Sequence, residues 1–384
     1  MDFLRLGLRN LRRNPRRTIF TAASLSLSLF IFSALQSVVA SLDANIEEVG
    51  KLPIAVVMHR SGFSHRVPLS YRDRIRKIRG VKSVVAMLWY GGSYGDPRAP
   101  EDNFMSMGGD SVDALRTMWG TNLKVSDSDW AAFMGDRTAA LVGPQLKERY
   151  GWERGQKVTL NGTVWPTDLT FTVAGTAAFR TDQAMFLFHR DYLDQALGGA
   201  GLVTLYWVEL ESVESLPEIA RLIDRELESA PEPTKTISQQ QLTTWYLGMI
   251  GDIRGIVRVT STLVILAILF VTANSIALST RERHAEIGVL KALGFQKRHV
   301  VTLLLIEALL LSVGGGALGC LAALLLFRNH AFSLGVGPLS GFKVDYAIVA
   351  TGFLISTLVG TGAAILPAWR AARLDPVAAL RKVS

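Results

Sequence analysis

The chain contains four long runs of apolar residues. They lie at 19–42, 259–278, 300–327 and 346–369. A helix rises about 1.5 Å per residue, so about 20 apolar residues cross the 30 Å hydrocarbon core of a bilayer. Each run meets this length, and Glu307 in the third is the one charged side chain within them. The pattern predicts four transmembrane helices rather than the buried helices of a soluble core.

Between the first two runs, short strand-like and helical patterns alternate. Strand-like stretches occur at 52–59, 81–90, 104–108, 157–160, 169–175, 185–188 and 204–211, and helical patterns at 70–79, 111–119, 144–150, 190–197 and 213–228. This mixture predicts a large α+β domain over 43–240. We expect two lobes, because the patterns at 52–90 and 204–228 look like halves of one lobe that an insertion divides. The first lobe would comprise about 43–110 and 201–240, and the second about 111–200.

The other segments connect or flank the apolar runs. Residues 1–17 are expected to form an amphipathic helix at the membrane surface, since leucines and arginines lie on separate stripes. We expect the first transmembrane helix at 18–42, a stalk and the second helix at 241–278, a loop at 279–299, the third helix at 300–327, an outer loop at 328–345, the fourth helix at 346–369 and a tail at 370–384. The stalk is expected to continue the second transmembrane helix without a break, because apolar residues recur at helical spacing through 239–256. The first run is longer than the apolar part of a signal peptide, so we interpret it as a retained anchor.

The positive charges indicate an orientation. The chain carries a net charge of +8, and six arginines lie within residues 1–17. Further Lys and Arg residues gather in 279–299 and 370–384, which places these segments and both termini in the cytoplasm by the positive-inside rule. Residues 41–255 contain 23 Lys and Arg against 27 Asp and Glu, a net charge of −4. The basic excess therefore faces anionic membrane lipids, and it does not indicate a nucleic-acid partner.

Few residues of the chain are candidates for a disulfide, a metal site or a catalytic site. Cys320, the single cysteine, lies within the third apolar run, so the α+β domain has no disulfide. The histidines show no spacing typical of metal ligands, and no Ser, Cys or carboxylate pattern indicates a nucleophile with its base. The phosphate-binding pattern GxxxxGK[ST] is absent from the sequence. We expect a chain that is not an enzyme and holds no metal or cofactor.

Four stretches, in order, resemble one family of membrane proteins. They are MIGDIRGIVRVTSTLVILAILFVTANSIALSTRERHAEIGVLKALGF, EALLLSVGGGALG and LPAWRAARLDPVAAL, together with AALVGPQLKERYGWERGQKVTL followed by FTVAGTAAF in the α+β domain. They are similar to the permeases of the FtsX/MacB/LolC family of ABC systems, with a MacB-like two-lobed domain between the first two helices. The resemblance implies two cytoplasmic ATPase subunits that bind ATP and Mg, a second permease as homodimer or heterodimer partner, and a membrane-fusion adaptor in some members. Unlike MacB, this chain has no ATPase of its own.

The loop at 279–299 contains the segment that the resemblance identifies as a coupling helix. Its expected contact residues are an apolar strip with charged neighbours and a final glycine: Ile287, Leu290 and Leu293, beside Arg283, Glu286 and Lys291, with Gly294 as a left-handed C-cap. An apolar strip with charged edges is typical of a helix that docks in a groove of a soluble protein. The alternative is a helix that lies on the lipid surface.

Two further features lie in the third apolar run. Glu307 is an intramembrane carboxylate, which is expected to face protein and to bond with the N-terminal arginines or a neighbouring backbone rather than to relay protons. Gly315, Gly316 and Gly319 form a small-residue face that permits close approach of helices, within the protomer or in a dimer. The alternative for these glycines is a local softening of the helix.

These observations predict the permease subunit of an ABC transporter in the bacterial inner membrane. Its separate ATPase would drive movement of the outer domain, and this movement would export or extract a lipophilic, lipoprotein or peptide cargo. The alternative is a signalling subunit that activates an envelope hydrolase or senses antimicrobial peptides. The cargo stays open at this stage.

Overall fold

The computed structural model of the chain describes residues 3–96, 98, 102–179, 182–327 and 344–373. They form two compact units, which we describe separately. Among the described residues, the membrane unit comprises 3–41, 252–327 and 344–373, and the α+β unit comprises those of 42–251. Most of the expected outer loop at 328–345 and the tail from 374 lie outside the described residues.

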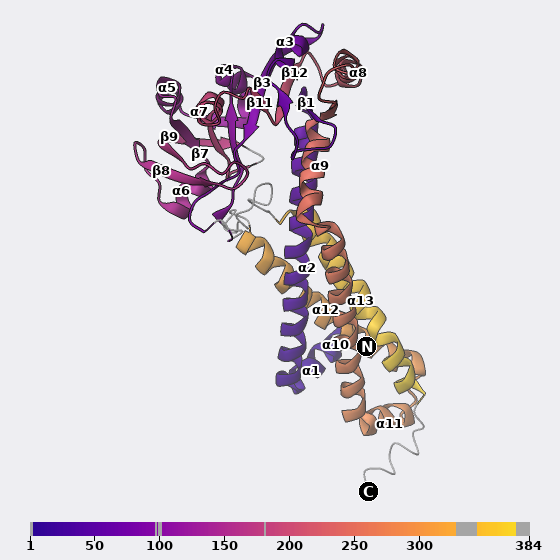
Figure 1. Ribbon diagram of the computed structural model, residues 1–384. Helices are drawn as coiled ribbons and strands as arrows, with labels where there is room; N and C mark the ends of the chain where they lie inside the picture. Colours follow the sequence, from indigo (N-terminus) through magenta and orange to yellow (C-terminus); the bar gives the residue numbers. More distant parts are fainter. Residues whose placement is uncertain (1–2, 97, 99–101, 180–181, 328–343, 374–384) are drawn as a thin grey trace. The chain divides into compact units, whose positions relative to one another are not determined.

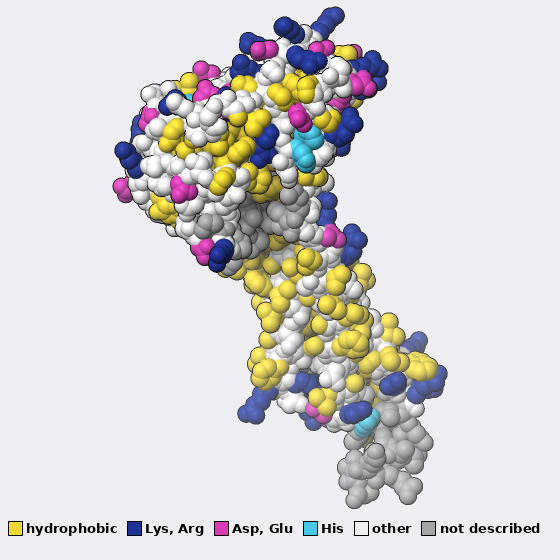
Figure 2. Space-filling view, viewed as in Figure 1, with side chains coloured by type: hydrophobic (Ala, Val, Ile, Leu, Met, Phe, Trp, Pro, Cys, Tyr) yellow, Lys and Arg dark blue, Asp and Glu magenta, His cyan; other side chains and the backbone are white. Residues whose placement is uncertain are grey.

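Helices make up the membrane unit. They are α1 (Phe3–Arg13), α2 (Pro15–Gly50, whose last residues belong to the α+β unit), α10 (Ile253–Glu282), α11 (His284–Ala292), α12 (Lys297–Phe327) and α13 (Tyr346–Ala372) (Figure 1). Four of them, α2, α10, α12 and α13, are long and apolar enough to cross a membrane, which confirms the four predicted spans. Hydrophobic side chains cover the unit, and Lys and Arg gather at the end where α1 and α11 lie (Figure 2).

The α+β unit is built on one mixed sheet. Its strands are β1 (Ile54–His59), β3 (Val81–Trp89), β4 (Gly92–Ser93), β5 (Ser106–Gly109), β6 (Leu123–Val125), β7 (Ala139–Val142), β8 (Lys157–Gly162), β9 (Leu169–Phe179), β10 (Phe186–His189), β12 (Leu205–Leu210) and β13 (Thr234–Ser238). They run in the order β13-β1-β12-β3-β5-β10-β7-β9-β8-β4, with β6 beside β9. The short strands β2 (Val67–Pro68) and β11 (Leu202–Val203) pair separately.

Helices cover this sheet on both faces. They are α3 (Tyr71–Arg76), α4 (Val112–Trp119), α5 (Asp127–Gly135), α6 (Pro144–Tyr150), α7 (Arg190–Ala196), α8 (Leu216–Glu226) and α9 (Gln239–Ile250). Every residue of β1 is buried, since α3 and α8 pack on one face and a second apolar cluster fills the other. Burial on both faces explains why β1 has the continuous apolar sequence IAVVM instead of an alternating one.

The segments expected to form two lobes contribute to one continuous sheet, which has two halves. The first half contains β1, β3, β12 and β13, and the second contains β7, β8, β9 and β10. The parallel pair β5–β10, in which Ser106 lies opposite Phe186, joins them. Each half has its own cluster of buried side chains under its helices, and a third cluster runs across the join. The halves therefore share hydrogen bonds and core.

One expected element is wrong. The stalk does not continue into the second span, because α9 ends at Ile250 and α10 begins at Ile253. Gly251 has φ 132°, which a helix cannot accommodate, and the Asp252 carboxylate caps the new helix by accepting a hydrogen bond from the Gly255 N–H at 2.8 Å. The apolar stripe over 239–256 thus belongs to two helices, one in each unit.

Candidate functional site

Two of the residues expected from the sequence, Arg283 and Glu307, meet where α1, α10, α11 and α12 come together. At the centre lies Glu307 of α12, whose side chain is 1% exposed. Its Oε2 accepts a hydrogen bond from Nη1 of Arg283 at 3.0 Å, and its Oε1 accepts one from Ser279 Oγ at 3.0 Å. The Arg17 guanidinium lies 3.6 Å from the same carboxylate. Because an unpaired charge in such surroundings is very costly, these partners account for the acid within the span.

Arg283 holds the turn between α10 and α11. It is the residue that separates the two helices, and it is 9% exposed. While one guanidinium nitrogen binds Glu307, the other donates to the Asn10 carbonyl oxygen at 3.2 Å. This one side chain therefore connects α12, the end of α10, the start of α11 and α1. We call Arg17, Ser279, Arg283 and Glu307 the buried polar cluster.

A second layer of polar contacts lies nearer to solvent. The Glu282 carboxylate accepts hydrogen bonds from Arg17 at 2.7 Å and from Asn14 at 3.0 Å. Arg13 pairs with Glu286 of α11, and both side chains are about half exposed or more. Exposed ion pairs contribute roughly 0–1 kcal/mol, so the buried polar cluster is the stronger connection.

The apolar residues of α11 divide between two environments. Ile287 is buried against Val300, Leu304 and two alanines of α13, whereas Leu293 is 73% exposed. Leu290 is half-buried. Residues at successive intervals of three drift by about 60° around a helix, so 287, 290 and 293 cannot share one narrow face. The large apolar side chains exposed on the described part of α11 and its cap are Val289 and Leu293, with Glu286 also exposed.

The end of α11 has the expected glycine cap. Gly294 has φ 92°, in the left-handed region, and its N–H donates to the Lys291 carbonyl oxygen at 3.1 Å. The Phe295 N–H donates to the Leu290 carbonyl oxygen at 3.0 Å, which completes a Schellman motif and confirms the predicted cap. Lys291 turns inward, since its Nζ donates to the Ala372 carbonyl oxygen at 3.1 Å. It is therefore not at the exposed edge of the helix.

A groove of about 430 Å³ lies between α1, α11 and the start of α12. Its lining combines Phe3 and Leu6 of α1, Leu290 of α11 and Leu303 of α12. The rings of Phe3 and His299 stack at one side, with centroids 6.0 Å apart. The amphipathic N-terminal helix thus packs against α11 and α12 through part of its apolar stripe.

The glycine face of α12 packs inside the protomer. A Cβ on Gly315 would lie 2.9 Å from the Leu25 Cβ of α2, and one on Gly319 would overlap the Ser26 carbonyl oxygen. Gly316 faces Ser356 of α13, whose Oγ a Cβ would meet at 2.5 Å. The part of the prediction that assigned these glycines to a dimer contact is therefore corrected, because α2 and α13 of the same chain cover them. Their role as close-packing positions agrees with the structure.

Arg283 as the partner of Glu307 is the main feature that the sequence interpretation missed, since it assigned Arg283 to the docking surface. The spacing of the two residues in the sequence did indicate this pairing. Arg283 and Glu307 lie equally far from Phe295 in the turn between α11 and α12. In a helical hairpin, residues equidistant from the turn come to lie opposite each other, and a buried acid requires a cation.

The membrane helices and the α+β unit each match a protein-family model. The FtsX-like permease C-terminal model matches residues 258–376, and the MacB-like periplasmic core domain model matches residues 18–226, which is more than half of the chain. An uncharacterized ABC transporter permease of Methanocaldococcus jannaschii is 21% identical over 402 aligned residues, covering 99% of this chain and 98% of that protein.

Other similar proteins match over shorter stretches. The macrolide export ATP-binding/permease protein MacB of Acinetobacter baylyi is 38% identical over 117 residues, which are 28% of this chain but only 16% of that protein. Among solved structures, the periplasmic region of MacB from Actinobacillus actinomycetemcomitans covers 51% of this chain and 93% of that chain, with 10% identity and a TM-score of 0.35. With an FtsX-like permease region after a MacB-like core domain, the chain belongs to the MacB/FtsX-type family of ABC transporter permeases.

Proposed function

We propose that this chain is the non-catalytic subunit through which a separate cytoplasmic ATPase moves the α+β unit to export or extract a lipophilic, lipoprotein or peptide cargo. Two ATPase copies would bind ATP and Mg, and each would contact α11 of one permease in a pair. A membrane-fusion adaptor would extend the path in systems that have one. The Lys and Arg residues around α1 and α11 support a cytoplasmic location for this end of the membrane unit.

The observation that carries the coupling proposal is the anchoring of α11. Its first turn is joined to α12 and α1 through the buried polar cluster, and Ile287 is packed against α12 and α13. A displacement of α11 therefore moves three neighbouring helices, because a buried ion pair and a close-packed side chain do not slide freely. Glu286, Val289 and Leu293 stay exposed for a partner.

A charge introduced at the exposed edge tests this docking surface. Purification of the complex in mild detergent, with mass spectrometry of the chains that co-purify, first identifies the ATPase. Leu293→Asp should then abolish co-purification, since a carboxylate within an apolar contact costs several kcal/mol. Gln296→Asp is the matched control, because it adds the same charge to an exposed residue just beyond the Gly294 cap.

A second variant tests the alternative, in which α11 lies on the lipid surface and does not dock on a protein. Leu8 is 46% exposed on the amphipathic α1, so Leu8→Asp weakens contact with lipid without touching α11. Loss of the ATPase from Leu293→Asp but not from Leu8→Asp supports docking. Equal retention of the ATPase by both variants contradicts it.

A further inference from the structure

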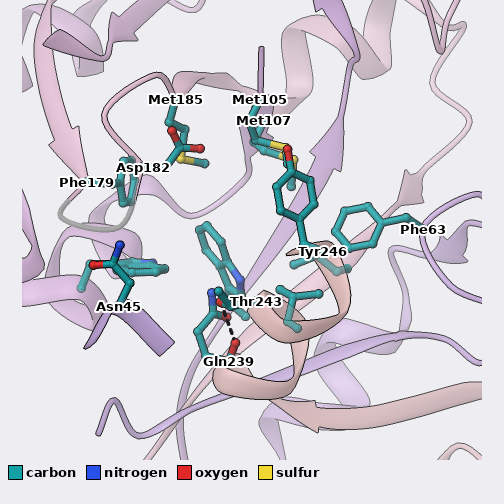
Figure 3. Close-up of a pocket in the computed structure, with 14 residues that line it drawn as sticks. Asn45, Phe63, Met105, Met107, Phe179, Asp182, Met185, Gln239, Thr243 and Tyr246 are labelled. Atoms are coloured by element: carbon teal, nitrogen blue, oxygen red, sulfur yellow. Dashed lines mark hydrogen bonds between the residues drawn. The ribbon is translucent and has the colours of Figure 1, made fainter. Parts of the chain in front are cut away.

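A cavity of about 110 Å³ lies within the α+β unit, far along the chain from the residues discussed above. One wall is α9, which contributes Gln239, Thr243 and Tyr246, as Figure 3 shows. The start of α9 is held by a capping box in which the Ser238 hydroxyl accepts from the Gln241 N–H and the Gln241 side chain accepts from the Ser238 N–H. The capping box therefore fixes the start of α9, and with it this wall of the cavity, relative to the sheet.

The rest of the lining is aromatic and sulfur-rich. Trp119 ends α4, Trp207 lies on β12 and Phe179 ends β9. The Trp119 ring contacts Trp207 and Phe179 edge to face, with centroids 5.1 and 5.3 Å apart. Three thioethers complete the surface: Met105, Met107 and Met185 (Figure 3). Aromatic faces attract cations, and methionine adapts to the shapes of different apolar groups.

One carboxylate belongs to this lining. Asp182 has no salt bridge with another described residue, and its Oδ1 accepts a hydrogen bond from the Ala184 N–H at 2.9 Å. Burial of the carboxyl raises its pKa to about 6. The pKa of Tyr246, which lines the same cavity, is also raised, first by burial and then by the charge of Asp182. They are the titratable residues among the described lining.

Three buried polar atoms of the same lining have no hydrogen-bond partner among the described residues. They are the indole N–H groups of Trp119 and Trp207 and the side-chain oxygen of Gln239. These residues are only 3%, 5% and 7% exposed. Buried polar groups in native proteins nearly always have a partner, which is another protein group, an ordered water or a bound molecule. Two unsatisfied donors and one unsatisfied acceptor in one cavity indicate a polar or charged occupant.

We propose that this cavity binds a protonated amine carried on a ring-sized apolar group, with the ammonium at Asp182 and the apolar part among the aromatic and thioether side chains. The apolar part is limited to about one ring, because a protein cavity of about 150 Å³ accepts benzene and this cavity of about 110 Å³ is smaller but partly open to solvent. The ammonium satisfies the Asp182 carboxylate, which has no salt bridge with a described residue, and the Gln239 oxygen, while the π face of the ring accepts from the indole N–H groups. The inference goes beyond the proposed function, because it requires neither the ATPase nor transport.

Three phenyl compounds that differ in their charge test the charge preference. The full chain in phosphatidylcholine nanodiscs at pH 8 is titrated with 2-phenylethylamine, 2-phenylethanol and 3-phenylpropanoate, and tryptophan fluorescence reports binding at Trp119 and Trp207. The amine should bind about tenfold more tightly than the alcohol, and the carboxylate should not bind, because a charge-assisted hydrogen bond is stronger than a neutral one. Asp182→Asn should remove the preference for the amine, so that the amine and the alcohol bind with similar affinity.

A second pair of variants tests the location of the site without altering a charge. Thr243 and Thr244 are neighbours on α9, and each donates a hydrogen bond to the carbonyl four residues earlier. Thr243 lines the cavity, whereas Thr244 is exposed. Thr243→Trp should fill the cavity and abolish amine binding, while Thr244→Trp should bind as the unmodified chain does. Equal affinities for the three compounds, or full amine binding by Thr243→Trp, would overturn the proposal and leave water as the occupant.

Discussion

Arg283 and Glu307 form a nearly solvent-free ion pair with a separation of 3.0 Å between two helices of the membrane unit. The arginine lies at the turn that starts α11, and the glutamate lies within a membrane span. Any force applied to the exposed edge of α11 therefore acts on a charge pair that is largely shielded from solvent. We expect this pair to be the most sensitive point of the membrane unit.

The first prediction concerns that pair. Glu307→Gln should destabilise the protein by about 3–5 kcal/mol, because it leaves the Arg283 charge buried without a counter-charge. Arg17 is less affected, since it keeps its bond to Glu282. The double variant Arg283→Met/Glu307→Met should recover most of the loss. Thermal unfolding in detergent measures both, and Arg13→Ala, which breaks an exposed pair, is the control with an expected change of at most about 1 kcal/mol.

The second prediction concerns the close approach of α12 and α2. Gly319→Ala places a methyl group against the Ser26 carbonyl, so the two backbones must separate and the unfolding temperature should fall clearly. Gly314→Ala is the matched change on the same helix, where an added Cβ meets nothing within 4 Å. It should be neutral or stabilising by up to about 1 kcal/mol, because alanine favours a helix over glycine. Equal unfolding temperatures for both variants would show that the close contact of α12 with α2 at Gly319 does not contribute to stability.

Orientation gives the third prediction. Asp127 has a side chain 93% exposed in the α+β unit, and Leu293 is 73% exposed at the end of α11. An impermeant maleimide should label Asp127→Cys in intact cells, and it should label Leu293→Cys only after the membrane is opened. The native Cys320 is buried and should give little background. Labelling of Leu293→Cys in intact cells would reverse the proposed topology.

The fourth prediction concerns pH. The pKa of Asp182 is raised from 3.8 to about 6 in the folded chain, so the folded state holds this proton more tightly than the unfolded state does. The contribution of Asp182 to stability is therefore greatest below about pH 4 and decreases as pH rises towards about 6, by at most about 3 kcal/mol. Asp182→Asn should flatten this part of the profile of unfolding temperature between pH 4 and 7. Identical profiles for the two chains would exclude Asp182 as the titrating group.

Most of the architecture could be predicted from patterns of apolar residues in the sequence. The four spans and most strands of the α+β unit were predicted, because apolar runs of 20 residues and buried β-rich runs such as IAVVM have few alternative structures. The strands β2, β4, β6, β7, β11 and β13 and the helix α5 were not predicted. The strand β13, with the sequence TKTIS, has alternating polar residues and gains its burial only by pairing with β1.

The details of the sites depend on contacts between distant segments. Spacing alone assigned Ile287 to a docking strip, but the packing of α12 and α13 against it decides its burial. The cavity near Asp182 collects side chains from α4, β5, β9, β12 and α9, and no local pattern links them. A helical stripe likewise did not reveal the break at Gly251, because a single positive φ leaves the periodicity of the flanking residues intact.

The buried polar cluster also bears on how the protein enters the membrane during synthesis. Arg17 emerges first from the ribosome, Ser279 and Arg283 follow much later, and Glu307 arrives last. An isolated span with a central acid inserts at a penalty of roughly 2.5–3.5 kcal/mol. The last member of the cluster therefore enters a bilayer in which its cations are already present. The helices made earlier therefore assist the insertion of α12. A chain that lacks Arg283 should insert α12 less efficiently, and this defect should be present before any ATPase binds.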